Sequence, residues 1–449
     1  MSTQSLHLGL IVMWVFQTLV SFSSQAIVAA YFGAGASLDA YVVGTTIPTT
    51  VYMIVSGGLS AAATVYVNQL KAREGEAEAR KKIGGLTVGL LAICVCIAIL
   101  TFLLANGLII LLAPGLGREV HEKAVACLMI TAPSIPFLAL FSFMTGLLQA
   151  EGRFYVTALS SILFVGLIPV PVLLSQEASP EKLAWGLNLS AVTSCTVLFL
   201  VSLSKEIIKN GPLEWSELKR ALTLSMPVLV AAVFTHAVWV CERYFASSLP
   251  PGGISALNYG QRILNFVAGG LTFVTSTTLL SRLTSCLRNG ETAEATRLNH
   301  EVIRVTNICA IVGVLGIVFG GEWIVRLAFA RGQFDESAIA LTTIALQLYL
   351  GMFVAYLYSV VLARNALAVG EGKVMVISTA ILLLSYLCLA PLFQRFFSFR
   401  GLALSASLAW LLSMLVYLFG MRKRHPFLYL SAQKDHCISA PTVSKPCAD

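Results

Sequence analysis

Long apolar stretches, separated by short charged connections, follow one another along almost the whole chain. A helix needs about 20 apolar residues to cross a bilayer, and windows of that size predict about twelve spans, at residues 8–31, 40–67, 84–113, 125–150, 154–175, 183–203, 221–248, 254–283, 302–328, 338–369, 374–393 and 401–421. Only 12% of the 449 residues are charged, against about 25% in soluble domains. The predicted fold class is therefore all-α, a polytopic membrane protein.

The basic residues alternate between the two sides of these spans. Of the Lys and Arg residues, 21 lie in the loops and termini of one side and seven in the loops of the other. Because loops rich in Lys and Arg stay in the cytoplasm, both termini are expected there. The first span has no charged segment before it and is too long for a signal peptide, so it is expected to remain as a helix. The net charge of +8 thus reflects topology, and no nucleic-acid partner is expected.

Short sequence echoes indicate that the chain consists of two similar halves. The paired segments are Gly57-Gly58-Leu59-Ser60 with Gly269-Gly270-Leu271-Thr272, Gly75-Glu76-Ala77-Glu78-Ala79 with Gly290-Glu291-Thr292-Ala293-Glu294-Ala295, and Glu151-Gly152-Arg153 with Glu371-Gly372-Lys373. Each pair falls at the same place in a six-span unit, and six spans return the chain to its starting side, which predicts parallel repeats. The expected organisation is an N-terminal lobe at 1–210, a C-terminal lobe at 211–424 and a cytoplasmic tail at 425–449.

Six prolines lie within predicted spans, and each removes a backbone donor from its helix. They are Pro48, Pro133, Pro136, Pro169, Pro171 and Pro227. They predict either ordinary kinks or hinges of a gated cavity.

Arg262 lies inside a predicted span with no other charged residue between positions 253 and 282. An arginine at membrane depth costs at least about 2.5–3.5 kcal/mol, so it usually faces a wet cavity or a partner. Its nearest candidate partners are Glu242 and Arg243, at the end of the preceding span. One hypothesis is that its planar donor fork binds an anion such as phosphate. The other is that it pairs with Glu242 and locks two helices together.

The motifs of common enzymes do not occur in the sequence. There is no phosphate-binding GxxxxGK[ST] loop, and no Ser-His-Asp or paired-carboxylate set at membrane depth. The ten cysteines include no CxxC pair and no Cys/His cluster with metal-ligand spacing. The sequence therefore favours a secondary transporter or a channel over an enzyme, and no cofactor or metal is expected.

Several short segments match one known family in their order and spacing. They are Ala26-Ile27-Val28-Ala29, Phe32-Gly33-Ala34-Gly35, Asp39-Ala40-Tyr41, Ile47-Pro48, Phe245-Ala246-Ser247, Ser255-Ala256-Leu257, Tyr259-Gly260-Gln261-Arg262, Arg331-Gly332-Gln333-Phe334 and Leu362-Ala363-Arg364. Together they resemble the MurJ/MviN family of lipid II flippases. The resemblance implies two six-helix lobes that form a V around a central cavity, in the bacterial inner membrane. It also implies alternating access driven by membrane potential or an ion gradient. The implied partners are a lipid-linked saccharide, membrane lipids and, as candidates, enzymes of cell-wall or polysaccharide synthesis.

The chain departs from this family at cavity positions. Ser24 and Gln25 stand where relatives usually have an Arg-Asp pair, Tyr52 where they have a basic residue, and Gln261 where an Asp precedes the arginine. Relatives that bind sodium combine the acid at Glu242 with Asn or Asp from the eleventh span, and here that span has neither. The candidate substrate-binding residues are Arg262, Arg243, Glu242, Asp39, Ser24, Gln25, Tyr52, Gln261 and Arg364.

Three functions remain open. The first is a flippase for lipid II or for another polyprenyl-diphosphate-linked saccharide, such as an exopolysaccharide or O-antigen precursor. The second is a drug or metabolite exporter of the same superfamily, which would be expected to have acidic cavity residues. The third is a membrane scaffold of a polymer-synthesis complex that no longer transports.

Overall fold

The computed structural model describes residues 3–56, 70–175, 177–209, 211–274 and 279–428, and within them every regular element is a helix. The helices are α1 Thr3–Phe32, α2 Ala36–Gly44, α3 Thr46–Ile54, α5 Glu76–Leu103, α6 Ala105–Leu112, α7 Arg118–Thr131, α8 Ser134–Ala150, α9 Phe154–Leu167, α10 Val170–Ser175, α11 Pro180–Ser204, α12 Trp215–Ala246, α13 Gly253–Val274, α14 Leu280–Arg288, α15 Thr292–Phe329, α16 Glu336–Leu348, α17 Leu350–Ala368, α18 Gly372–Phe397, α19 Phe399–Arg424 and the 3-10 turn η3 Pro426–Leu428. The all-α fold class is confirmed.

Within the described residues, each predicted span coincides with one helix or with helices separated by a short break. In the described part of the chain, nine helical segments are long and apolar enough to cross a membrane, and ten when the bent pair α7–α8 counts as one span. The two further predicted spans correspond to α2–α3 and to α13. The first continues into residues outside the described part. The second carries polar residues that lower its hydropathy.

Two of the in-span prolines coincide with breaks in helices. The chain bends by 53° between α7 and α8, at Pro133, and α9 and α10 are separated at Pro169. Proline removes a donor and crowds the carbonyl four residues earlier, which explains both breaks. Pro227, in contrast, lies inside the continuous helix α12. The bends are thus present, and a role as hinges remains a prediction.

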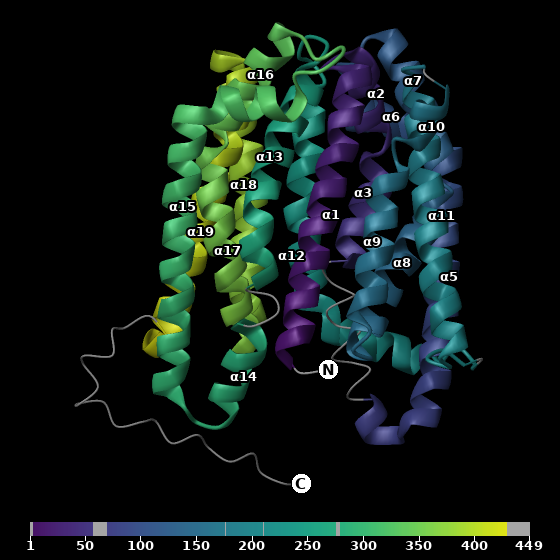
Figure 1. The fold of residues 1–449 in the computed structure, drawn as a ribbon, viewed down its shortest axis with the longest axis vertical. Coiled ribbons are helices and arrows are strands. Elements are labelled where there is room, and N and C mark those ends of the chain that lie inside the picture. Colours follow the sequence, from purple (N-terminus) through teal and green to yellow (C-terminus); the bar gives the residue numbers. More distant parts are fainter. Residues whose placement is uncertain (1–2, 57–69, 176, 210, 275–278, 429–449) are drawn as a thin grey trace.

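The helices form two groups, as Figure 1 shows. Helices α1–α11 form the N-terminal group and α12–α19 the C-terminal group, and α1, α12 and α13 lie where the two groups meet. One of the sequence echoes has a structural counterpart. Gly75 and Gly290 take positive φ angles of 81° and 75°, and each closes the turn before a long helix, α5 and α15. The proposed lobes at 1–210 and 211–424 meet in the link between α11 and α12, and their behaviour as separate bodies stays a prediction.

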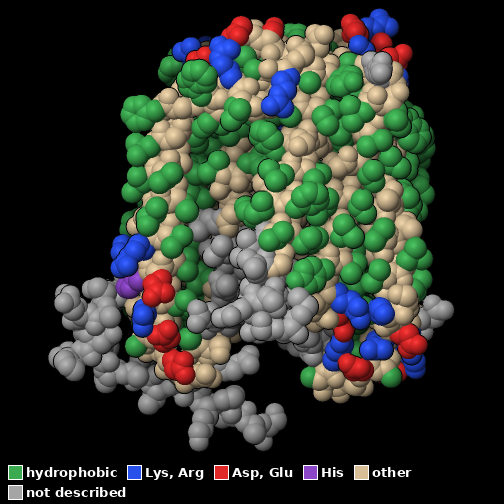
Figure 2. Space-filling model, viewed as in Figure 1, with side chains coloured by type: hydrophobic (Ala, Val, Ile, Leu, Met, Phe, Trp, Pro, Cys, Tyr) green, Lys and Arg blue, Asp and Glu red, His purple; other side chains and the backbone are tan. Residues whose placement is uncertain are grey.

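On the face shown in Figure 2, a broad apolar belt crosses the molecule, and charged side chains gather at its two ends. At the end where α1 starts, ion pairs connect residues of the N-terminal group to one another and to the start of α12. The pairs are Lys71–Glu151, Arg73–Glu217 at 2.7 Å, Lys82–Glu74 at 2.7 Å and Lys82–Glu214 at 3.3 Å. Hydrogen bonds from Lys82 and Arg73 hold the pKa of the Glu74 carboxyl below its ordinary value. We call this the basic end.

At the opposite end, the backbones of the two groups come into direct contact, and we call this contact the seam. Gln333 donates its backbone N–H to the Ala30 carbonyl at 2.8 Å. Gly252 (φ +89°) and Gly332 (φ +59°) permit this approach, because a Cβ atom would lie 2.2 Å from the Ala34 carbonyl oxygen at the first position and 2.2 Å from that of Ala30 at the second. Since only glycine tolerates both the angle and the contact, the seam needs these residues.

Replacing Gly252 with Ala should separate the two groups at the seam, since the new methyl cannot coexist with the Ala34 carbonyl. Double electron–electron resonance should show a longer distance between spin labels on the exposed residues Arg118 and Glu336 than in the otherwise unchanged protein. Gly290→Ala is the matched control, because that glycine also has a positive φ but has nothing within 4 Å of a Cβ. Equal distance changes in both variants would mean that backbone strain, and not the contact, is responsible.

Candidate functional site

Asp39, on α2, holds the first turn of α13 across the seam. Its carboxylate accepts hydrogen bonds from the backbone N–H of Gly252 at 2.6 Å, the N–H of Ser255 at 2.7 Å and the Ser255 hydroxyl at 2.5 Å. The first N–H groups of a helix lack partners within the helix and carry a partial positive charge. The carboxylate satisfies both needs, so the predicted site residue Asp39 connects the two groups of helices.

Glu242, on α12, is the centre of a buried polar cluster. Its carboxylate accepts from the Gln261 amide at 2.6 and 2.9 Å and from the Tyr349 hydroxyl at 3.2 Å. The Arg243 guanidinium lies 3.2 Å from the same carboxylate. All four side chains are buried, and the negative charge of Glu242 is therefore compensated within the C-terminal group of helices.

The hypothesis that Arg262 pairs with Glu242 is wrong for the described residues. Glu242 is occupied by Gln261, Tyr349 and Arg243. The reason is helical geometry: consecutive residues of a helix point in directions about 100° apart. Gln261 faces α12, and Arg262 is directed away from it.

Arg262 is half-buried on α13. Its Nε donates to the Asn258 side chain at 2.8 Å, and Tyr41 on α2 lies close enough to interact with it electrostatically. Asn258, Arg262 and Asn265 follow spacings of four and three residues, which place them on one face of α13. Among the described side chains, no carboxylate forms an ion pair with Arg262.

Gln25 and Ser24 are buried in α1. The Ser24 hydroxyl has no hydrogen-bond partner among the described residues. Tyr52 lies in an aromatic cluster with Phe141 and Phe164, with ring centroids 6.2 and 5.7 Å away. At position 52, where the family resemblance implies a basic residue, this chain therefore has a tyrosine that packs against aromatic rings.

Arg364 is half-buried on α17, within electrostatic reach of Tyr356 and Tyr417. The structure thus brings together Glu242, Arg243 and Gln261 in one cluster. Arg262 follows Gln261 on α13 but contacts Asn258 instead, and Tyr52 and Arg364 lie elsewhere. Among the described residues, no group of three His, Cys, Asp or Glu side chains is placed to hold a metal ion.

Sequence reasoning missed the polar residues that accompany the predicted ones. Asn258 and Asn265 share a helix face with Arg262, and their spacing in the sequence was a usable signal. Ser255 appeared only as part of a family motif, although it binds Asp39 through two atoms. Tyr349 lies between α16 and α17, far from Glu242 in sequence, and no local pattern announces its contact.

Asp39→Asn should weaken the seam, because an amide offers one acceptor oxygen where the carboxylate offers two and because the charge is lost. Hydrogen bonds to charged groups contribute about 1.5–3 kcal/mol, so we expect a clearly lower melting temperature and lobes separated at the seam. Asp335→Asn is the matched control, since Asp335 also accepts from a helix N-terminal N–H, that of Ala338 at 2.8 Å, but within one group of helices. Unchanged seam distances in Asp39→Asn would contradict this role.

Glu242→Leu should leave the Arg243 charge buried without compensation and lower the free energy of unfolding by about 3–5 kcal/mol. The double variant Glu242→Leu/Arg243→Leu should recover most of that loss. Glu336→Leu breaks the exposed ion pair with Arg326 at 2.6 Å and should cost less than about 1 kcal/mol. Denaturant unfolding in mixed micelles measures all three, and a double variant no more stable than the single one would disprove the compensation.

The sequence of this chain is similar to those of known proteins. The model of the family described as lipid II flippase MurJ matches residues 28–446. A probable lipid II flippase MurJ from Buchnera aphidicola subsp. Acyrthosiphon pisum is 23% identical over 436 residues, covering 95% of this chain and 84% of the relative. A probable lipid II flippase MurJ from Vibrio cholerae is 25% identical over 439 residues, covering 92% and 82%.

Solved structures show the same fold. A lipid II flippase MurJ in an inward closed conformation superposes with a TM-score of 0.80 at 22% identity, over 92% of this chain and 87% of that one. An inward-facing multidrug resistance transporter of the MATE family gives a TM-score of 0.76 at 15% identity, over 93% and 96%. The family match extends over nearly all of the sequence, so the chain belongs to the lipid II flippase MurJ family.

Proposed function

We propose that the chain moves a polyprenyl-diphosphate-linked saccharide from the inner to the outer leaflet of the bacterial inner membrane, with both termini in the cytoplasm. The observation that carries this proposal is Arg262, a half-buried cation on α13 that is bound by Asn258. The relatives named above are lipid II flippases, and a diphosphate is the part of such a lipid that needs a cation.

The charges around Arg262 favour an anionic ligand. The Asp39 carboxylate is matched by the start of α13, and the Glu242 carboxylate by Arg243, Gln261 and Tyr349. Arg262 keeps the positive charge that remains. Ser255 and Arg262 are seven residues apart on α13, which corresponds to about 10 Å at 1.5 Å per residue. Arg262 is therefore about one third of the thickness of an apolar layer of about 30 Å away from the turn that Asp39 holds.

The seam supplies the gate that this transport requires. With the basic end in the cytoplasm, as the charge distribution predicts, the Asp39 end faces outward and is closed by direct backbone contact. The described arrangement then corresponds to a state closed toward the outer leaflet. Release of the headgroup on that side requires the hydrogen bonds between Asp39 and α13 to break.

The saccharide is either that of lipid II or that of a related polymer precursor. Ser24, Gln25 and Tyr52 replace charges that relatives carry, and Tyr52 is occupied with aromatic packing. Fewer cations remain to bind a diphosphate. We therefore favour a substrate whose saccharide contributes more of the binding than it does in relatives with a full cationic set.

Depletion of the protein should cause lipid-linked intermediates to accumulate on the cytoplasmic leaflet, and Arg262→Gln should fail to clear them. Arg118→Gln is the matched control, because the Arg118 side chain is 93% exposed and forms only a surface pair with Glu122. The fraction of headgroups that a protease or lectin can reach from each side of the membrane measures how the lipid is distributed between the two leaflets.

Each alternative function has its own outcome in this experiment. Full clearance by Arg262→Gln would remove Arg262 from the mechanism. Normal polymer export together with increased drug sensitivity after depletion would support an exporter. Loss of polymer on depletion, restored by a variant that cannot translocate lipid, would support a scaffold.

A further inference from the structure

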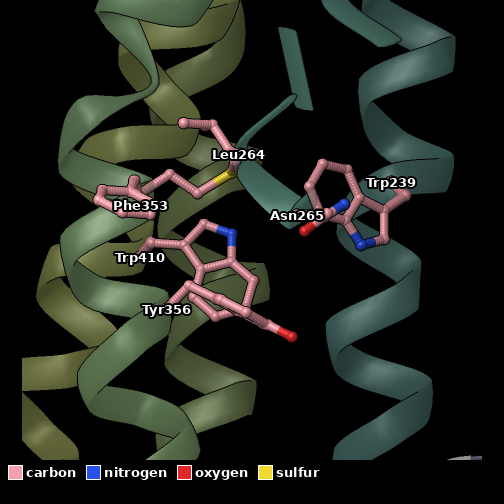
Figure 3. A pocket seen from close by; sticks show the side chains of 7 residues that line it. Trp239, Leu264, Asn265, Phe353, Tyr356 and Trp410 are labelled. Carbon is pink, nitrogen blue, oxygen red and sulfur yellow. The ribbon is translucent and has the colours of Figure 1, made fainter. Parts of the chain in front are cut away.

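A recess in the C-terminal group of helices is lined in part by Asn265, three residues after Arg262 on α13, and has no part in the polar clusters described above. Side chains of α12, α13, α17 and α19 line it, among them Trp239, Asn265, Tyr356 and Trp410. Figure 3 shows these aromatic rings and the Asn265 amide around one open space, with apolar side chains behind them. None of the described residues that line the recess is charged.

Trp410 provides a donor without a partner. Its side chain is 6% exposed, and its indole Nε1 has no hydrogen-bond partner among the described residues. The ring is fixed by an edge-to-face contact with Tyr356, with centroids 5.8 Å apart at 74°. In Figure 3 the indole nitrogen points toward Asn265 and Trp239. An unsatisfied buried donor costs about 1–3 kcal/mol, and a ligand acceptor in the recess would remove that cost.

Asn265 adds a donor and an acceptor at the open side of the recess. Its side chain is exposed, and an amide offers two N–H donors and one carbonyl acceptor. It stands three residues after Arg262 on the same face of α13, a rise of about 4.5 Å along the helix. If Arg262 binds the anionic group of a ligand, the next group of that ligand can therefore reach the recess.

The chemistry of the lining selects a neutral polyhydroxylated ring. Flat aromatic faces pack against the C–H face of a sugar, and the indole N–H, the tyrosine hydroxyl and the amide can bond with hydroxyl or acetamido groups at its edge. We propose that this recess binds one sugar ring of the transported lipid, next to the diphosphate at Arg262. The assignment rests on the proposed function and extends it.

The recess is small, with a volume of about 30 Å³. Because one buried water needs roughly 10–15 Å³ on the same measure, the recess admits one edge of a ring and not the whole ring. The sugar nearest the diphosphate would place that edge in the recess, and the rest of the saccharide would extend away from it.

A hydrophobic cation is the competing ligand, because aromatic faces also attract positive charge. The described lining residues include no carboxylate, and Arg262 lies one turn away on α13, so both features disfavour a cation. A competition arm with tetraphenylphosphonium decides the matter. Displacement of the sugar-bearing lipid by this cation, lost in Trp239→Leu, would overturn the carbohydrate assignment.

The test compares two lipids on the purified full-length protein in nanodiscs. The probes are undecaprenyl diphosphate and undecaprenyl diphosphate N-acetylglucosamine, and the measured quantity is the ratio of their dissociation constants. We expect wild type to bind the sugar-bearing lipid about tenfold more tightly, equivalent to about 1.4 kcal/mol. Trp410→Phe and Asn265→Ala should bring the ratio close to one and leave the affinity for undecaprenyl diphosphate unchanged.

Trp323→Phe is the matched control for Trp410→Phe, because Trp323 lies on α15 with 77% of its surface exposed. Asn265→Ala guards against a folding defect, since that side chain is exposed. A wild-type ratio near one, or variants that keep the wild-type ratio, would falsify the sugar subsite. Arg262→Gln should weaken both lipids equally. If neither lipid binds the wild type, the proposed function fails together with the subsite.

Discussion

The hydrogen bonds between Asp39 and the start of α13 connect the two halves of this protein, and the remaining polar groups can be understood in relation to them. A charge inside an apolar layer is costly unless it is matched. Asp39 is matched by a helix N-terminus, and Glu242 by Arg243, Gln261 and Tyr349. Among the described residues, Arg262 has no carboxylate partner and donates to the amide oxygen of Asn258. The charges of Asp39 and Glu242 thus have structural roles, whereas the charge of Arg262 is available to a ligand.

Much of the fold could be predicted from the sequence because the bilayer imposes a simple rule of length and apolarity. In the described part of the chain, every predicted span has a helical counterpart, and the family resemblance is confirmed. Spans that break into two helices could not be predicted residue by residue. Pro133 and Pro169 interrupt helices, while Pro227 does not, since neighbouring helices decide whether a bend is tolerated.

The candidate site could be predicted only in part. The sequence marks Arg262 because an isolated charge in an apolar stretch is conspicuous, but it does not reveal which face of α13 meets Glu242. The adjacent residue Gln261 meets it, and this single step along the helix separates a structural pair from an available cation. The aromatic recess depends on side chains from four helices, and no pattern within one helix could indicate it.

The continuity of α13 has a consequence for how access to the site changes. The helix has 22 residues, so it is about 33 Å long, and it is held at its first turn by Asp39. If it tilted by about 10° around that first turn, its far end would sweep through about 6 Å, while Arg262 would move by only about 2 Å. Such a tilt of α13 would widen the entrance at the far end of the helix and leave a ligand at Arg262 nearly stationary. The seam would then act as the fulcrum of this motion, and the entrance and the binding group could be tuned separately by changes at opposite ends of one helix.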